Sequence, residues 1–136
     1  MTSKIAIVGT GLVGRAWSVV FARAGHSVEI YDPIDGASDS ALKLMETNLP
    51  ALADADLLHG ETPAAVLARI RRADSLEQVL DGAVHCQESA PERVEVKAAL
   101  YKDLDRIAAP ETALASSTSG IPASQFSEGL PGQRRV

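Results

Sequence analysis

Three glycines near the N-terminus constrain the fold more than any other feature of the sequence. Gly9, Gly11 and Gly14 follow the apolar run Ile5–Val8 and precede an amphipathic segment. In a strand–turn–helix unit, the first glycine forms a tight turn and the second lets the backbone approach a pyrophosphate. The third lets the helix pack close to the strand. The free N–H groups at the start of such a helix would face the phosphates, so the spacing predicts a dinucleotide-binding unit.

An acidic residue stands where this unit needs one. The helix predicted over Val13–Ala24 is ended by Gly25, a second strand is predicted over Val28–Tyr31, and Asp32 follows that strand. A carboxylate at this place accepts hydrogen bonds from the adenosine ribose and repels a 2′-phosphate. The three residues after Asp32 include no arginine that could bind such a phosphate. We therefore predict NAD, rather than NADP, as the cofactor.

The composition narrows the class of protein further. Hydrophobic residues make up 46% of the chain and aromatic residues only 4%, so the core must be mainly aliphatic, as in parallel sheets covered by helices. A formal net charge of -5 argues against a nucleic-acid partner. No apolar run reaches the roughly 18 residues of a membrane span. The single cysteine, Cys86, precludes an internal disulfide, and we expect a cytoplasmic protein without a membrane partner.

The remaining segments complete an α/β pattern. We predict one domain over residues 1–136, a Rossmann-type doubly wound parallel sheet with helices on both faces. Further elements are expected as a helix over Ala37–Leu49 ended by Pro50, a helix capped by Thr62 that runs to about Arg69, a strand over Ile70–Ala73, a helix over Leu76–Asp81 capped by Ser75, a strand over Ala83–Glu88, a helix opened by the capping-box pair Ser89 and Glu92 and closed by Pro110, and a strand over Thr112–Ala115. Gln133–Val136 resembles the start of another strand, so we expect the natural chain to continue.

Loops at the carboxyl ends of the strands form the ligand crevice in such a sheet. This rule places the glycine loop, Asp32, Glu88–Glu92 and Ser116–Ser119 along one rim. The hydroxyl cluster would suit a polar ligand, although serine and threonine are also ordinary residues of turns and caps. The three histidines lack a spacing that indicates a metal site, and Cys86 is expected to be a buried, inert thiol.

Taken together, these motifs resemble a known family. Val8–Arg15 with Asp32, Gln87–Glu92 with Lys97, and Ser116–Ser119 occur in the order found in the L-3-hydroxyacyl-CoA dehydrogenase superfamily. The forms Gln-Glu-x-x-Pro-Glu and Ser-Ser-Thr-Ser are similar to those of the lambda-crystallin and L-gulonate 3-dehydrogenase branch. The fatty-acid enzymes carry asparagine where this chain has Ser117. The resemblance covers nearly the whole chain.

The resemblance implies a role for each matching position. The pyrophosphate loop would comprise Gly9, Thr10, Gly11, Leu12, Val13 and Gly14. Asp32 would hold the adenosine ribose, and Glu92 and Lys97 would lie on the nicotinamide side. Ser119 would be a catalytic residue that binds the substrate hydroxyl or its carbonyl product.

The same resemblance implies what this chain lacks. The family's catalytic histidine stands in a His-x-x-Asn-Pro motif, oriented by a later glutamate, and is expected beyond Val136. His26, His59 and His85 do not stand in such a motif. A C-terminal helical domain, which in the family completes the cleft and a homodimer, is also expected there. We therefore expect this chain to bind NAD without turnover.

The substrate class is left between two alternatives. Between Asp32 and Ala68 the only basic residue is Lys43, which weakens an acyl-CoA substrate and favours a small polar hydroxy acid. A fatty-acid-type L-3-hydroxyacyl-CoA dehydrogenase remains an alternative, as does a non-catalytic, NAD-binding or crystallin-like protein. Two other classes are excluded. A short-chain dehydrogenase needs a Tyr-x-x-x-Lys motif, and neither Tyr31 nor Tyr101 is followed by that lysine. A P-loop NTPase needs Gly-Lys-Ser/Thr after the glycine loop, and this chain lacks it.

Overall fold

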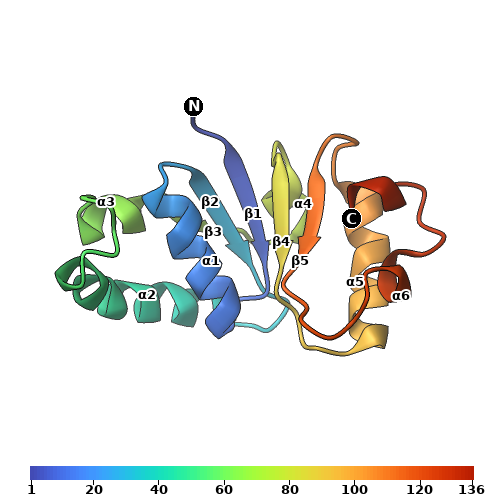
Figure 1. Ribbon diagram of the computed structural model, residues 1–136, viewed down its shortest axis with the longest axis horizontal. Helices are drawn as coiled ribbons and strands as arrows, with labels where there is room; N and C mark the ends of the chain where they lie inside the picture. The colour runs from blue at the N-terminus through green and yellow to red at the C-terminus, as the bar shows by residue number, and fades with distance from the viewer.

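The computed structural model describes residues 1–136 and contains one parallel sheet (Figure 1). Its five strands lie in the order β3-β2-β1-β4-β5. Their bounds are Lys4–Val8 for β1, Ser27–Tyr31 for β2, Ile70–Arg72 for β3, His85–Glu88 for β4 and Ala113–Ser116 for β5. Every neighbouring pair is parallel. The strand order reverses direction between β1 and β4, which confirms the doubly wound sheet predicted from the sequence.

Helices cover both faces of this sheet (Figure 1). The helices are α1 Leu12–Arg23, α2 Ala37–Asp54, α3 Pro63–Ala68, α4 Leu76–Leu80, α5 Val94–Ile107 and the short α6 Ser124–Ser127. Alternate side chains of β1 point to opposite faces of the sheet and enter two separate hydrophobic cores. Ile5 and Ile7 join the cluster that includes residues of α1, α2 and α3, whereas Ala6 and Val8 join the one that includes residues of α4, α5 and α6. None of the helices combines the length and hydropathy that a membrane span requires.

Local signals place several helix ends as predicted. Thr62 accepts a hydrogen bond from the Ala65 N–H at 3.1 Å and caps α3, which has proline at its first turn. Ser75 accepts from the Gln78 N–H at 3.1 Å and caps α4. These capping predictions are therefore confirmed.

The prediction that Pro50 ends the second helix is wrong. Helix α2 continues through Pro50 to Asp54. A proline inside a helix removes one backbone hydrogen bond and costs about 3 kcal/mol. Met45 and Leu49 are buried before it, and Leu52 after it packs against the same core. Burial of this continuous apolar face outweighs the local penalty.

Two further expectations are corrected by the structure. Ser89 and Glu92 do not form a capping box, because α5 begins only at Val94 and its N-cap residue makes no side-chain capping bond. Both side chains instead bind residues of the loop after β5. The C-terminal residues 133–135 form a 3-10 helix rather than the start of a strand. Arg135 explains this compact turn, since its guanidinium pairs with Asp105 at 2.9 Å.

Candidate functional site

The turn after β1 can be built only with glycine at two positions. Gly9 has φ +98°, and a Cβ there would lie 2.6 Å from the carbonyl oxygen of Ser89. A Cβ on Gly14 would lie 1.8 Å from the carbonyl oxygen of Gly9. Helix α1 therefore packs directly against the turn that follows β1, and this turn packs against the loop that follows β4. Both glycines are explained by contacts within the protein.

Gly11 differs from these two glycines. Its φ is -67°, and a Cβ placed there would meet no protein atom within 4 Å. It forms the N-cap of α1 without a side-chain capping bond, so the first N–H groups of the helix remain available. Packing within the chain therefore gives no reason for glycine at this position. An approaching pyrophosphate would give one, as the sequence pattern predicts.

Asp32 is held beside this loop by several hydrogen bonds. Its Oδ2 accepts from the backbone N–H of Thr10 at 2.9 Å and from the Thr10 hydroxyl at 3.0 Å. Its Oδ1 accepts from the Ile34 N–H at 3.0 Å. An ionised carboxylate offers about four acceptor positions, so capacity remains for a ribose hydroxyl. The turn and the acid thus form one unit before any ligand arrives.

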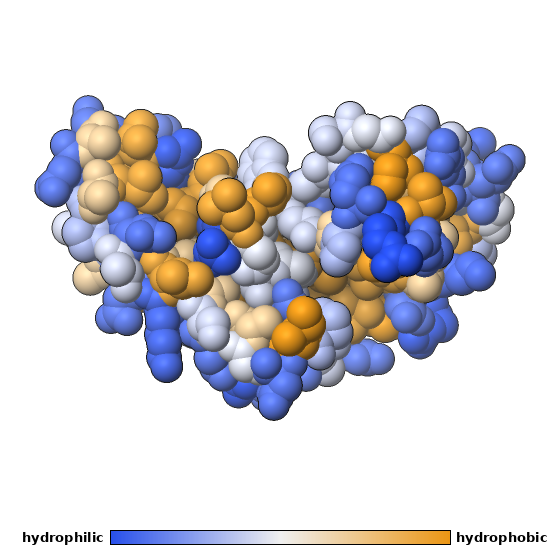
Figure 2. All heavy atoms as spheres, turned by 90° about the horizontal axis from the view of Figure 1, so that it is seen from below, coloured by the Kyte–Doolittle hydropathy of each residue, from blue (hydrophilic) through white to orange (hydrophobic).

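A cavity of about 650 Å³ opens beside this unit. It is lined by the glycine turn, by the segment after β2 and by the loop after β4, including Gly9, Thr10, Gly11, Asp32, Ser89 and Pro91. The cavity lies at the carboxyl ends of the strands, which run downward in Figure 1. Figure 2 views the molecule from that end and shows several apolar patches on this face, separated by pale and hydrophilic residues. The size and lining of the 650 Å³ cavity suit the adenosine half of a dinucleotide.

Beyond β4 and β5 lies a buried ionic network that the sequence analysis did not predict. Glu88 is fully buried, and its carboxylate accepts from Lys97 Nζ at 2.7 Å, from the Ala90 N–H at 2.7 Å and from the Ser116 hydroxyl at 2.6 Å. Ser116 Oγ in turn accepts from the Thr118 N–H at 3.1 Å. Glu88 therefore joins the two loops that follow β4 and β5. An acid at the end of a predicted strand, with a lysine on the next helix, was the available signal.

Glu92 makes the second link between these loops. Its carboxylate accepts a hydrogen bond from the hydroxyl of Thr118. That bond, with the nearby Lys97 charge and backbone N–H groups of the 119–120 segment, holds the pKa of Glu92 below its ordinary value. Glu92 is thus an exposed anion tied to the segment that carries Ser119.

Ser119 and Lys97 are the other two residues that the resemblance assigns to the nicotinamide and substrate side of the site. Ser119 is exposed and its hydroxyl makes no hydrogen bond within the chain, so it is free to meet a ligand. Lys97 is 1% exposed, with its Nζ 2.7 Å from Glu88 and 3.8 Å from Glu92. Neither Ser119 nor Lys97 lines the 650 Å³ cavity. A direct contact of Lys97 with a cofactor therefore stays a prediction, whereas its contact with Glu88 is observed.

Cys86, His26 and His85, which the sequence analysis did not assign to the site, are buried or hydrogen-bonded within the fold. Burial raises the pKa of the Cys86 thiol to about 12, so it stays protonated and unreactive. His26 accepts from the Ser3 N–H at 3.3 Å, and His85 shares a hydrogen bond with Gln87 at 3.0 Å. No group of three or more His, Cys, Asp or Glu side chains is arranged to hold a metal ion.

Comparison with known proteins places this geometry in a family. Residues 4–136 match the family described as 3-hydroxyacyl-CoA dehydrogenase, NAD binding domain. The lambda-crystallin homolog of Mus musculus is 35% identical over 127 residues, which cover 93% of this chain and 40% of that protein. L-carnitine dehydrogenase of Staphylococcus epidermidis is 34% identical over 98% of this chain and 40% of its own length. The chain thus spans about 40% of these relatives.

Solved structures agree with this placement. The 3-hydroxybutyryl-CoA dehydrogenase of Escherichia coli K12 superposes with a TM-score of 0.87 at 28% identity, over 99% of this chain and 28% of that one. The (S)-3-hydroxybutyryl-CoA dehydrogenase of Ralstonia eutropha gives a TM-score of 0.86 at 25% identity, over 97% of this chain and 46% of that one. The overall fold therefore agrees with that of these two enzymes. This chain therefore belongs to the NAD-binding domain family of the 3-hydroxyacyl-CoA dehydrogenases.

Proposed function

We propose that this chain is the cofactor-binding part of an NAD-dependent dehydrogenase that acts on the 3-hydroxyl of a small hydroxy acid. The observation that carries the proposal is Gly11, which the protein's own packing leaves unexplained, beside the anchored carboxylate of Asp32. When bound, NAD supplies the hydride acceptor. The start of α1 would bind its phosphates and Asp32 its adenosine ribose. The loops joined by Glu88 and Glu92 would present Ser119 to the substrate oxygen.

The charges around Asp32 support NAD over NADP. Arg72 is the cation near the segment after β2, and it is already paired, with Nη2 2.9 Å from Asp74 and Nε 3.5 Å from Asp39. A pocket of about 200 Å³ beside Asp32 is lined by Asp35, Asp39 and Asp74 together with that arginine. A 2′-phosphate would therefore meet mainly carboxylates there.

We also propose that this chain by itself does not catalyse the reaction. Oxidation of an alcohol needs a general base near its proton, most often a histidine. His26 and His85 are engaged in structural contacts, and His59 lies in the connection before α3. The base would come from a His-x-x-Asn-Pro motif elsewhere in the natural protein. A steady-state rate with any 3-hydroxy acid from this chain alone would contradict this part.

The substrate class rests on the charge of α2 and its surroundings. Lys43 is the only cation between Asp32 and Ala68, which leaves little to bind the phosphates of CoA. Two relatives are named for lambda-crystallin and for L-carnitine dehydrogenase, and structural neighbours are named for 3-hydroxybutyryl-CoA. With NAD+, a natural protein that contains this domain should therefore show a higher kcat/KM for L-gulonate or L-carnitine than for (S)-3-hydroxybutyryl-CoA. The opposite ranking would favour the fatty-acid-type alternative. The homodimer, the cytoplasmic location and the absence of nucleic-acid and membrane partners remain part of this proposal.

The decisive experiment is a titration of this chain with NADH and, separately, with NADPH. Trp17 is the only tryptophan and lies on α1, so energy transfer from its indole to the nicotinamide reports binding. Saturable binding of NADH, with NADPH at least about tenfold weaker, is the expected result. Equal affinities would remove Asp32 from the argument. Binding of neither to a folded chain would contradict the proposal.

A further inference from the structure

A second cavity lies between α1 and α2 and is separate from the cofactor cavity. Its volume is about 500 Å³, within the range typical of small-molecule sites. It is lined by Leu12, Arg15, Ala16, Val19, Val20, Arg23, Met45, Asn48, Ala51, Leu52 and Leu57. No residue of this α1–α2 groove lines the cofactor cavity. The groove has no acidic side chain, in a chain whose formal net charge is -5.

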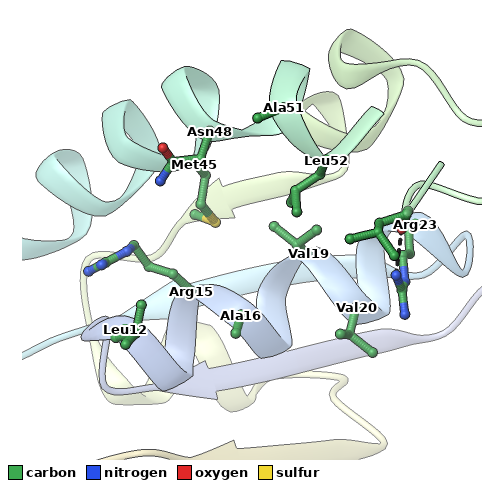
Figure 3. Close-up of a pocket in the computed structure, with 11 residues that line it drawn as sticks. Leu12, Arg15, Ala16, Val19, Val20, Arg23, Met45, Asn48, Ala51 and Leu52 are labelled. Carbon is green, nitrogen blue, oxygen red and sulfur yellow. Dashed lines mark hydrogen bonds between the residues drawn. The ribbon is translucent and has the colours of Figure 1, made fainter. Parts of the chain in front are cut away.

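The groove has apolar walls and a cation at each end (Figure 3). Val19 from α1 and Met45 and Leu52 from α2 point toward one another across it. Arg15 lies at the end next to the glycine turn, and Arg23 lies at the other. Arg23 follows Arg15 by eight positions along the helix, a rise of about 12 Å at ~1.5 Å per residue.

The two arginines differ in the hydrogen bonds that they already make within the chain. Arg23 donates to the carbonyl oxygen of Leu57, which closes its end of the groove. Arg15 is half-buried, and its one hydrogen bond is a long contact of 3.3 Å to the carbonyl oxygen of Thr10. Neither arginine belongs to any ion pair of the chain. A guanidinium carries five N–H donors, so most of those of Arg15 remain for an external anion.

We propose that the α1–α2 groove binds an aliphatic carboxylate, with its chain between the two helices and its carboxylate on Arg15. Apolar walls favour a hydrocarbon chain, and the fork of Arg15 matches a carboxylate in a bidentate arrangement. The absence of acids removes the repulsion that such an anion would meet elsewhere on this chain. The inference goes beyond the proposed function, because the two cavities share no residue and its test needs no turnover. Leu12, at the end of the groove, is the one lining residue that also belongs to the proposed pyrophosphate loop.

The experiment is a calorimetric titration of the chain with octanoate in the absence of cofactor. Saturable binding is expected, together with chemical-shift changes at the Met45 methyl group. Butyrate lacks the chain and octanol lacks the charge, so both should bind more weakly. Arg15→Gln should weaken octanoate about tenfold, the size expected for a lost charge-assisted hydrogen bond. Arg71→Gln is the matched control, because Arg71 is exposed, forms no ion pair and lies outside the groove, and it should leave the affinity unchanged.

A second variant tests the cavity itself. Ala16 is exposed on α1 and lines the groove, so Ala16→Phe should fill the groove and abolish octanoate binding while the melting temperature is kept. No binding of octanoate to the wild type would overturn the proposal, as would equal affinity for wild type and Arg15→Gln, or octanol binding as tightly as octanoate. If Arg15→Gln weakens ADP but not octanoate, the guanidinium serves the cofactor phosphates and the proposal is wrong. Arg15→Lys, which keeps the charge, should retain part of the affinity.

Discussion

The rim that we propose for the cofactor has two ends, an adenosine end and a nicotinamide end, and they are built in different ways. At the adenosine end, the turn after β1 and the acid after β2 lie on neighbouring strands, and backbone groups make most of the contacts. Gly9, Gly14 and Asp32 form this end through close approach and hydrogen bonds to the main chain. At the nicotinamide end, side chains from β4, α5 and β5 meet around a buried ion pair of Glu88 and Lys97.

This difference shows that the two ends of one rim can be held in place by separate kinds of contact. Glycine at the adenosine end allows main-chain atoms to approach at distances that any side chain would forbid. At the nicotinamide end, Glu88 satisfies donors from three different segments and so fixes loops that have no regular structure of their own. We therefore expect substitutions to act through sterics at one end and through charge at the other.

The largest effect is expected from breaking the buried ion pair. Lys97→Met would leave the carboxylate of Glu88 buried without its countercharge, at a cost of about 3–5 kcal/mol in the free energy of unfolding. Urea denaturation measures this loss. Lys102→Met on the same helix is the control, because Lys102 is exposed and should change stability little. If the double variant Glu88→Gln/Lys97→Met is no more stable than Lys97→Met, the loss comes from packing rather than from charge.

A smaller but still large effect is expected at Gly14. A Cβ there would lie 1.8 Å from the Gly9 carbonyl oxygen, so Gly14→Ala must displace the turn and should cost about 3 kcal/mol. Alanine is otherwise the better helix former, so a loss cannot come from helix propensity. Gly120→Ala is the matched control, since a Cβ there meets no atom within 4 Å. Equal thermal stability of the two variants would show that the turn is adaptable.

Gly11 separates binding from stability. Gly11→Ala adds a methyl group that meets no protein atom within 4 Å, so unfolding free energy should fall by no more than about 1 kcal/mol, the cost of alanine at an N-cap. NADH affinity should fall at least about tenfold, because the methyl group occupies the path of the pyrophosphate. The Trp17 energy-transfer titration compares the NADH affinities of the wild type and Gly11→Ala, and urea denaturation compares their stabilities. Unchanged NADH affinity would indicate that the phosphates bind elsewhere.

The smallest effect concerns the pH dependence at Glu92. Its pKa is lowered chiefly by the Thr118 hydroxyl, so Thr118→Val should raise that pKa toward its ordinary value of 4.5. In the wild type, the stabilisation from this bond is present above the ordinary pKa and is lost as pH falls through the lowered one. NMR titration of the Glu92 side chain follows the change. Thr47→Val, which removes an unrelated hydroxyl on α2, should leave the titration curve in place.

Long, strongly patterned segments were predicted well from the sequence, and the exceptions have physical causes. The five parallel strands and the helices between them appear in the predicted order. Thr62 and Ser75 cap their helices through hydrogen bonds over three residues, which sequence spacing can reveal. Pro50 misled the prediction because a local rule does not include the core that α2 covers.

The candidate site was predicted less evenly. The glycine turn and Asp32 were identified because their spacing carries their geometry. Ser89 and Glu92 were predicted to cap a helix. Instead, Ser89 binds Ser117, 28 residues further along the chain, and Glu92 binds Thr118, 26 residues further along. Glu88 was missed for the same reason: its role depends on neighbours from three separate segments.

The sequence by itself determined the parallel sheet, the glycine turn and the acid after β2, because alternation, helical periodicity and close spacing act over short stretches of chain. Only the tertiary structure decided that Lys97 is buried against Glu88, that the loops after β4 and β5 are joined, and that α1 and α2 leave an arginine-ended groove. These features depend on which side chains and helices the folded chain brings together. Neither hydropathy nor spacing along the chain carries that information.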